Sequence, residues 1–448
     1  MVELSFLLGA VVILGGLSIW RLFAYRFPHP ADLATVSVFY YSLPLTLAAL
    51  YLGDDSGSLF LHSAAADRDI AIQGLYYAVL AAACLQLGRY LAAKIRRSDV
   101  RFYFPLAASD TPKANAFILL LIAEICLGIV LFGPEVYFSG YNVDSKEASG
   151  TLGTALIYLS IEWLGLVISY ELIVSRATLR RLSWPFVGLA VAVVISLGIA
   201  RGKRLEVISA LLPTGVIVFA TSRFFRTMHS RVLIVVVAAV LISAMASLRF
   251  GEAPSVLSLL FNLTSEGLYA GHSLPGIIER INSGEIDYEY GARVAAGFLA
   301  FIPRFLWPDK DDMLYAGNAA LDGVNPLGAT SILAEVVFQG GATAVVLYFT
   351  ILGFIFERVY KFVADFDVAL AARRVPVAAL AYLVIVTSLI PHFRDGLMPS
   401  IKIPLQSLAF LFALAGLSWV PSLTWRVVRR QGTYIRPKAL TAPKTDVG

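Results

Sequence analysis

Basic residues gather in a very short link between two apolar runs. The sequence ARGKRLE, at residues 200–206, places Arg201, Lys203 and Arg204 between stretches that could each cross a bilayer. Arginine offers a planar, two-pronged donor to phosphate, and the glycine among these cations lets a ligand approach the backbone. The link therefore indicates an anion site. The alternative is that these side chains extend to the phosphates of membrane lipids.

Further cations lie in separate links of the chain. If those links share one side of a membrane, their side chains can converge on a phosphate carried by a lipid at headgroup depth. Taken singly, each is more often a solvated or paired surface residue, and a lone histidine is usually hydrogen-bonded at the surface. The residues predicted to bind such a lipid-carried phosphate and the group attached to it are Arg201, Arg204, Arg249, Arg304, Lys310, His392 and Arg394.

Two carboxylates are candidates for a general base. Glu335 lies in SILAEVVFQGG, at the mouth of an apolar run, and Glu252 follows Arg249 in RFGE. Either could take a proton from a sugar hydroxyl in an enclosed site, or could simply pair with a nearby arginine. Glu124 and Glu162 fall inside apolar runs, where a proton path is possible, but a structural role is favoured.

Several kinds of chemistry are not indicated. The chain has no P-loop, no dinucleotide-binding fingerprint and no spacing of His and carboxylates that suggests a metal, so we expect neither metal nor cofactor. The acidic run DKDD at 309–312 is expected to cap or solvate a loop. Cys84 and Cys126 lie in apolar runs without a CxxC spacing. No nucleic-acid partner is expected.

The composition is that of a membrane protein. Of the 448 residues, 58% are hydrophobic and 15% are charged, and the mean hydropathy is +0.75. Runs of about 20 apolar residues recur along the whole chain. We therefore expect a single all-α polytopic membrane domain, 1–448, with about eleven transmembrane helices. The predicted spans are 4–20, 33–52, 70–91, 115–134, 153–174, 185–200, 205–221, 232–248, 336–355, 376–391 and 403–419.

The charges of the links predict an orientation. Most of the 36 Lys and Arg fall in alternate links and in the basic tail 420–448, which the positive-inside rule assigns to the cytoplasm. The N-terminus is then outside and the C-terminus inside. The segment 249–335 becomes one large outer loop. Within it, 292–303 is too short to span and is expected to form an interfacial or re-entrant helix ended by Pro303.

One part of the chain resembles a known family. The stretch FIPRFLWPDK, followed by NPLGATSILAEVVFQGGATAVVLYFTILGF, resembles the Wzy-type O-antigen polymerases, which polymerise oligosaccharide repeat units. The resemblance covers roughly residues 300–400. The residues that carry it are Ile302, Pro303, Arg304, Trp307, Pro308, Lys310, Glu335, Gly340 and Gly341, with Arg394, Asp395 and Gly396 further along.

The resemblance implies an activity, a location and partners. The family is composed of bacterial inner-membrane glycosyltransferases that use undecaprenyl-pyrophosphate-linked oligosaccharides on the outer leaflet to build O-antigen, capsule or exopolysaccharide. Arginines would hold the pyrophosphate leaving group, and Glu335 would be the base, so that neither metal nor nucleotide is required. The expected partners are these lipid-linked oligosaccharides, the membrane lipids, a chain-length regulator and a flippase.

Other classes remain open. An O-antigen ligase would use the same donor with a different acceptor, and its sequence features would be much the same. A flippase or secondary transporter would favour an internal repeat and polar residues at mid-membrane, which the sequence does not suggest. A structural subunit of a secretion complex is the fourth possibility.

Overall fold

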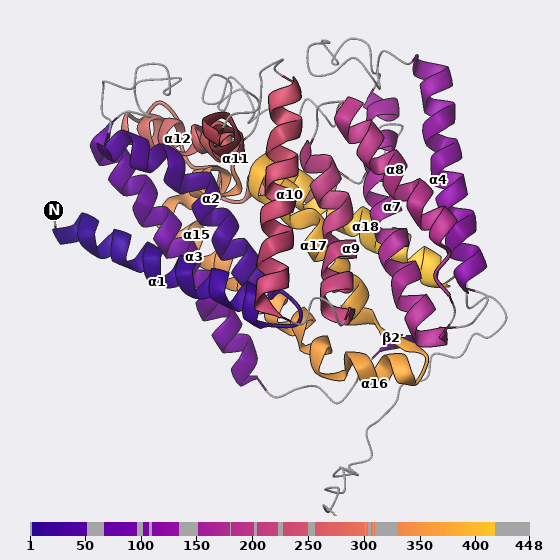
Figure 1. The fold of residues 1–448 in the computed structure, drawn as a ribbon. Coiled ribbons are helices and arrows are strands. Elements are labelled where there is room, and N and C mark those ends of the chain that lie inside the picture. Colours follow the sequence, from indigo (N-terminus) through magenta and orange to yellow (C-terminus); the bar gives the residue numbers. More distant parts are fainter. Residues whose placement is uncertain are drawn as a thin grey trace, which may run out of the picture.

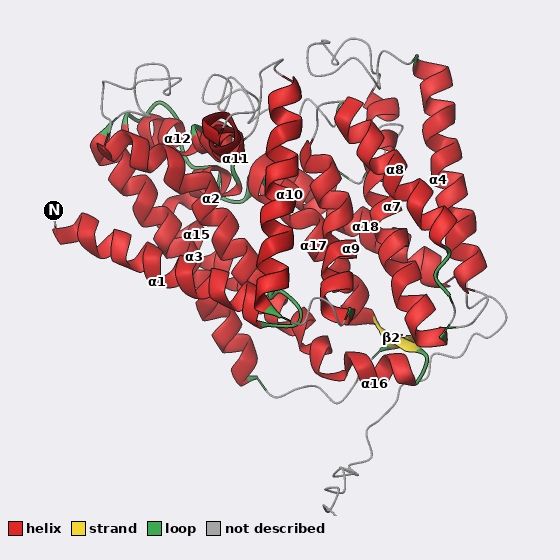
Figure 2. Cartoon of the chain, in the orientation of Figure 1, coloured by secondary structure: helices red, strands yellow, loops and turns green. Residues whose placement is uncertain are grey.

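The computed structural model describes residues 2–51, 67–95, 102–106, 110–133, 151–179, 181–200, 204–222, 227–249, 256–300, 302, 306–307, 309 and 330–416. Apart from connecting loops and two short strands, these residues are helical (Figures 1 and 2). The elements are α1 (Val2–Ala24), α2 (Pro30–Tyr51), α3 (Arg68–Lys94), β1 (Tyr103–Pro105), α4 (Asp110–Phe132), α7 (Thr151–Thr178), α8 (Trp184–Ala200), α9 (Arg204–Thr221), α10 (Met228–Arg249), α11 (Val256–Gly271), α12 (Ser273–Asn282), α13 (Ala292–Leu299), α15 (Ile332–Tyr360), η5 (Lys361–Asp365), α16 (Phe366–Ala371), β2 (Arg374–Pro376), α17 (Val377–Asp395) and α18 (Leu397–Gly416).

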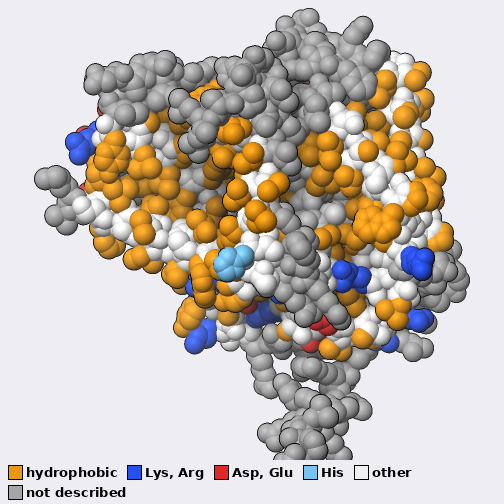
Figure 3. Space-filling view, in the orientation of Figure 1, with side chains coloured by type: hydrophobic (Ala, Val, Ile, Leu, Met, Phe, Trp, Pro, Cys, Tyr) orange, Lys and Arg blue, Asp and Glu red, His pale blue; other side chains and the backbone are white. Residues whose placement is uncertain are grey.

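The fold is all-helical, as the apolar runs predict. A helix occupies each of the predicted spans. Among the described residues, five helices, α1, α2, α3, α4 and α15, are long and apolar enough to cross a membrane. Apolar side chains such as Val12 on α1 and Val130 on α4 are largely exposed. Figure 3 shows hydrophobic side chains over the flanks of the molecule, the surface expected of a multi-pass membrane protein.

Two apolar cores hold the helices together. One lies between α7, α9 and α17 and includes Leu164, Val167 and Leu383. The other lies between α2, α3 and α15 and includes Leu85 and Phe349. Each core is thus built from helices that are far apart in the sequence.

Small residues bring α3 and α15 into close contact. A Cβ atom at Gly88 of α3 would lie 2.0 Å from the Thr350 carbonyl oxygen, and one at Gly353 of α15 would lie 2.1 Å from the Leu85 carbonyl oxygen. Only glycine fits at both positions. The two helix backbones therefore touch directly, which is the packing that small residues allow between membrane helices.

The bundle has two distinct ends. Figure 1 shows α16 and β2 at one end, called here the α16 end, and α11 and α12 at the opposite end, called the α12 end. Cations assigned to the cytoplasm gather at the α16 end: Arg26 pairs with Asp367 of α16, Arg176 donates to the Thr221 carbonyl, and Arg231 donates to the Phe23 carbonyl. Strands β1 and β2 pair antiparallel there, with Tyr103 opposite Pro376.

The predicted outer segment contains more helix than expected. Helices α11 and α12 lie in it, and neither was predicted. The expected helix 292–303 is found as α13, but it ends at Leu299, and the N–H of Ile302 bonds to the Leu299 carbonyl. The expectation that Pro303 itself ends this helix is therefore wrong. Ala300 keeps helical dihedral angles, and the i→i+3 bond at Ile302 is the tighter bonding that is common at helix C-termini.

Candidate functional site

A cluster of polar side chains lies near the α12 end, where α13, α15 and α18 meet. We call it the Glu335 cluster; it consists of Glu289, Arg293, Glu335 and Gln339 with the backbone of Gly396 and Leu397. Its place at this end is fixed by the cap of α15, because Ser331 caps that helix and exchanges hydrogen bonds with Ser273, the first residue of α12. Three helices that are distant in sequence thus supply the cluster.

Glu335 lies in the first turn of α15 and is buried, with 7% of its side chain exposed. Its Oε2 atom accepts a hydrogen bond of 2.7 Å from the backbone N–H of Leu397, the first residue of α18. The positive end of the α18 dipole faces this carboxylate. The backbone of Gly396 covers its other side, since a Cβ atom there would lie 2.3 Å from Oε1.

Arg293 joins two carboxylates. Its Nε atom donates to Oε2 of Glu289 at 2.9 Å, and its Nη1 atom lies 3.6 Å from Oε1 of Glu335. The guanidinium carbon is 5.6 Å from the centre of the Phe338 ring. Arg293 is almost fully buried, and pairing with two acids compensates the cost of removing its charge from water.

Gln339 fixes the loop that carries Glu289. Its Nε2 atom donates to Oε2 of Glu289 and its Oε1 atom accepts from the Gly291 N–H, both at 2.9 Å. The N–H of Glu289 bonds to the Phe338 carbonyl at 3.1 Å. The loop is therefore held to α15 by backbone as well as side-chain contacts.

A break in α15 follows directly after Gln339. Gly341 has φ +58° and ψ −140°, a conformation that only glycine adopts readily, so the helix axis changes there. A Cβ atom at Gly341 would lie 3.0 Å from the Tyr288 hydroxyl. The glycine pair that the resemblance singles out thus makes a kink and gives the loop room to pack.

The end of α17 lies beside the Glu335 cluster, because Gly396 and Leu397 follow it directly. His392 is buried; its ring stacks on that of Tyr348, and its Nε2 atom is 3.1 Å from the Tyr348 hydroxyl. Arg394 is partly exposed and donates to Oδ1 of Asp395 at 3.1 Å. His392 and Arg394 thus lie near the Glu335 cluster. His392 is buried, whereas 23% of the Arg394 side chain is exposed.

The structure places the other predicted residues only in part. Helix α9 begins at Arg204 and α10 ends at Arg249, both toward the α12 end in Figure 1, but their side chains lie outside the described part of the chain. Arg201, Glu252, Arg304 and Lys310 also lie outside the described residues. Their convergence on a phosphate stays a prediction.

Three members of the cluster were not predicted from the sequence: Glu289, Arg293 and Gln339. The pair Glu289 and Arg293 could have been identified from the sequence, because an acid and an arginine four residues apart often form an ion pair across one helical turn. Gln339 stands alone in an apolar run before the glycine pair. A polar residue in that position marks a buried hydrogen bond.

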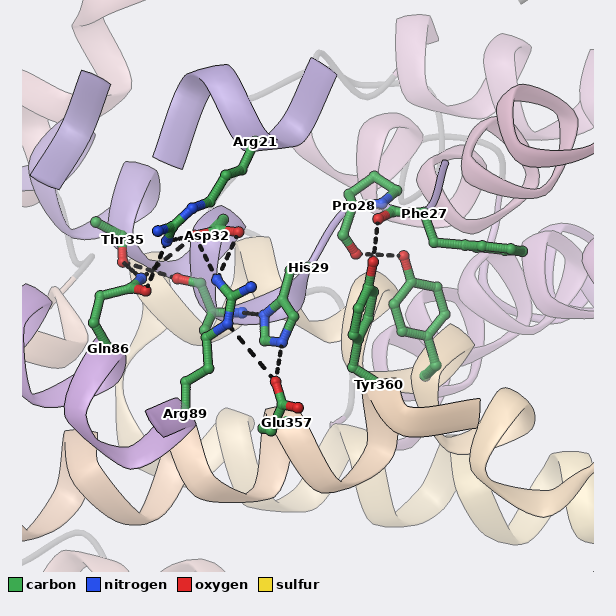
Figure 4. Close-up of polar contacts among 12 residues, drawn as sticks. Arg21, Phe27, Pro28, His29, Asp32, Thr35, Gln86, Arg89, Glu357 and Tyr360 are labelled. Atoms are coloured by element: carbon green, nitrogen blue, oxygen red, sulfur yellow. Dashed lines mark hydrogen bonds and ion pairs between the residues drawn. The ribbon is translucent and has the colours of Figure 1, made fainter. Parts of the chain in front are cut away.

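A second polar cluster lies near the opposite end and joins α1, α2, α3 and α15 (Figure 4). Asp32 is fully buried; both of its carboxylate oxygens accept from Nη1 of Arg89, at 3.1 and 3.0 Å, and Arg21 lies 3.5 Å away. Gln86 donates to Asp32 and to Thr35. None of these residues was predicted to interact. The cluster holds the four helices together.

His29 extends this second cluster, and its contacts define its protonation. Its Nδ1 atom accepts from the N–H of Ala31 at 3.0 Å, so the ring proton is on Nε2, which lies 2.9 Å from Oε2 of Glu357. Arg89 approaches the same carboxylate at 3.7 Å. Burial lowers the pKa of His29 below its usual value, although the hydrogen bond to Glu357 opposes the shift.

The intramembrane acid Glu124 has a partner on a neighbouring helix. It forms a side-chain hydrogen bond with Ser160 of α7. Glu162, also of α7, is buried.

No family model, curated protein or solved structure matches the chain.

Proposed function

We propose that the chain is an integral membrane glycosyltransferase that polymerises oligosaccharide repeat units carried on undecaprenyl pyrophosphate. The observation that carries the proposal is the buried pair of Arg293 and Glu335, from two separate helices, at one end of an apolar bundle. Arg394 lies two residues before Gly396, whose backbone packs on the Glu335 carboxylate. The resemblance over residues 300–400 names the same acid and the same late arginine. In this proposal the site lies at the depth where a lipid-linked phosphate and its glycan meet.

The chemistry needs cations and a base. A pyrophosphate leaving group departs well once its charge is held, so preorganised arginines supply most of the catalysis. Arg394, and the predicted residues Arg201, Arg204 and Arg304, would hold the pyrophosphate. A single carboxylate would take the proton of the acceptor hydroxyl.

The proposed setting is a bacterial inner membrane. We infer about eleven spans, with the α12 end facing outward and the basic α16 end facing the cytoplasm. The site then opens on the outer leaflet, where a flippase delivers the donor and a chain-length regulator limits the product. The gathering of Arg26, Arg176 and Arg231 at the α16 end supports this orientation.

The test uses a strain from which the gene has been deleted. It is complemented with the wild-type chain, with Arg394→Ala or with Arg304→Ala, and membrane levels are compared. Single repeat units should accumulate on the carrier at the outer leaflet in the deletion and in both variants. Trapping of these units at the cytoplasmic face would identify a flippase and refute the proposal. Normal polymer that stays on the carrier would instead identify a ligase.

A further inference from the structure

Two carboxylates in the Glu335 cluster compete for the role of proton acceptor. Glu289 and Glu335 share Arg293, and each could stand beside an acceptor hydroxyl. Their surroundings differ in how much of each carboxylate a substrate could reach. This difference decides which of them can touch the reacting atoms.

Glu335 is closed to a substrate. Its Oε2 atom is held by the Leu397 N–H, Arg293 lies on the side of Oε1, and the Gly396 backbone covers the carboxylate. Only 7% of the side chain is exposed. A hydroxyl could reach Oε1 only if the junction between α17 and α18 moved away.

Glu289 is open. Within the described part of the chain, both hydrogen bonds to its carboxylate end on Oε2, one from Arg293 and one from Gln339. The side chain is 15% exposed, about twice as much as that of Glu335. Two donors on one oxygen fix the plane of the carboxylate, and they leave Oε1 free to accept a further hydrogen bond.

We propose that Glu289 is the general base of the glycosyl transfer and that Glu335 is a positioning residue, an assignment that rests on the proposed function. The acceptor hydroxyl gives its proton to Oε1 of Glu289 while its oxygen bonds to the anomeric carbon of the donor. The bond from that carbon to the phosphate oxygen breaks, and its electron pair leaves with the pyrophosphate carrier. Glu289 then releases the proton to water.

Glu335 acts on this base through Arg293. Its carboxylate holds the guanidinium on one side while Glu289 is held on the other, so the two acids compete for one cation. The N-terminus of α18 binds Glu335 separately. A movement at Gly396 would therefore be passed to Glu289 through one arginine.

The experiment measures polymerisation by purified chain in detergent. The substrate is the pool of carrier-linked single repeat units extracted from the deletion strain. Glu289→Gln keeps an oxygen that accepts from Arg293 and Gln339, so the loop should stay in place. We expect kcat to fall by about 10²–10⁴-fold with little change in KM. Glu335→Gln keeps an acceptor for the Leu397 N–H and should lose less than about tenfold.

Three further variants separate chemistry from folding. Glu285→Gln, on the same loop, changes an acid that is 60% exposed and should retain wild-type activity. Gln339→Ala removes one loop contact but leaves the base, and should lose much less than Glu289→Gln. Added formate should restore part of the kcat of Glu289→Ala, which a purely structural role would not allow.

The outcomes are distinct. If the wild-type chain leaves the single repeat units unchanged, the proposed function is wrong. If the wild type polymerises them and Glu289→Gln keeps kcat within about threefold, or if formate restores nothing, Glu289 is not the base. A loss in Glu335→Gln larger than that in Glu289→Gln would return the base to Glu335.

Discussion

Glu335 and Leu397 are 62 residues apart, yet the carboxylate of one accepts a 2.7 Å hydrogen bond from the backbone N–H of the other. The contact joins the first turn of α15 to the first residue of α18. It places a negative charge at the positive end of a 20-residue helix. One side chain thus fixes the junction between α17 and α18 beside the candidate site.

Replacing Glu335 by alanine should destabilise the fold. The change leaves the α18 N-terminus without its acceptor and Arg293 with one acid instead of two, at a cost of about 1–3 kcal/mol. Thermal unfolding in detergent measures it. Glu335→Gln should recover much of the loss, because its amide oxygen can accept from Leu397. Equal losses in the two variants would contradict the capping role.

Gly396→Ala should be far more damaging than alanine at another glycine with a positive φ. Gly396 has φ +85°, and an added Cβ would lie 2.3 Å from Oε1 of Glu335. Gly284, with φ +74°, has nothing within 4 Å of such a Cβ. Gly284→Ala should therefore lose only about 1 kcal/mol, the backbone cost alone. Similar unfolding temperatures for both variants would show that Glu335 moves aside.

Asp32→Asn should weaken the bundle at its other end. The acid is fully buried between Arg21 and Arg89, and neutralising it leaves two partly buried cations without their shared partner. The expected loss is about 3–5 kcal/mol. Asp367→Asn is the matched control, because Asp367 is 67% exposed in its pair with Arg26 and should lose at most about 1 kcal/mol. Equal losses would show that the buried network adds nothing.

His29 makes stability depend on pH. Burial lowers the pKa of His29 in the folded chain below 6.5, its usual value. Near and just below pH 6.5 the unfolded chain therefore binds a proton at His29, whereas the folded chain does not. This contribution is complete above pH 6.5 and is lost as the pH falls below it, by up to about 1.4 kcal/mol per pH unit. Unfolding should be followed from pH 8 to 5 in wild type and His29→Gln. The variant should show the smaller slope, and parallel slopes would exclude His29 as the cause.

The helices could be predicted from the sequence. A long apolar run that crosses a membrane must satisfy its backbone hydrogen bonds within itself, so it forms a helix whatever the rest of the chain does. Each predicted span coincides with a helix, although α15 begins at Ile332, four residues before the predicted start of its span, and the kink at its glycine pair was not predicted. Helices α11 and α12 were missed. Polar and apolar residues are mixed along both helices, so a long hydropathy window does not detect them. Packing stabilises them instead, as where Gly267 of α11 lies against the Tyr40 carbonyl.

The site itself was only half accessible from the sequence. The residue types of Glu335, His392 and Arg394 marked them as candidates, since charged and polar groups near apolar runs need a reason to be there. Which acid is the more exposed, and which is buried as a helix cap, depends on how α13, α15 and α18 cross. That crossing is set by contacts between residues dozens of positions apart, such as Gly297 against Ile401 and Glu335 against Gly396. Apolar periodicity decides that helices form, whereas only their packed register decides which polar groups meet.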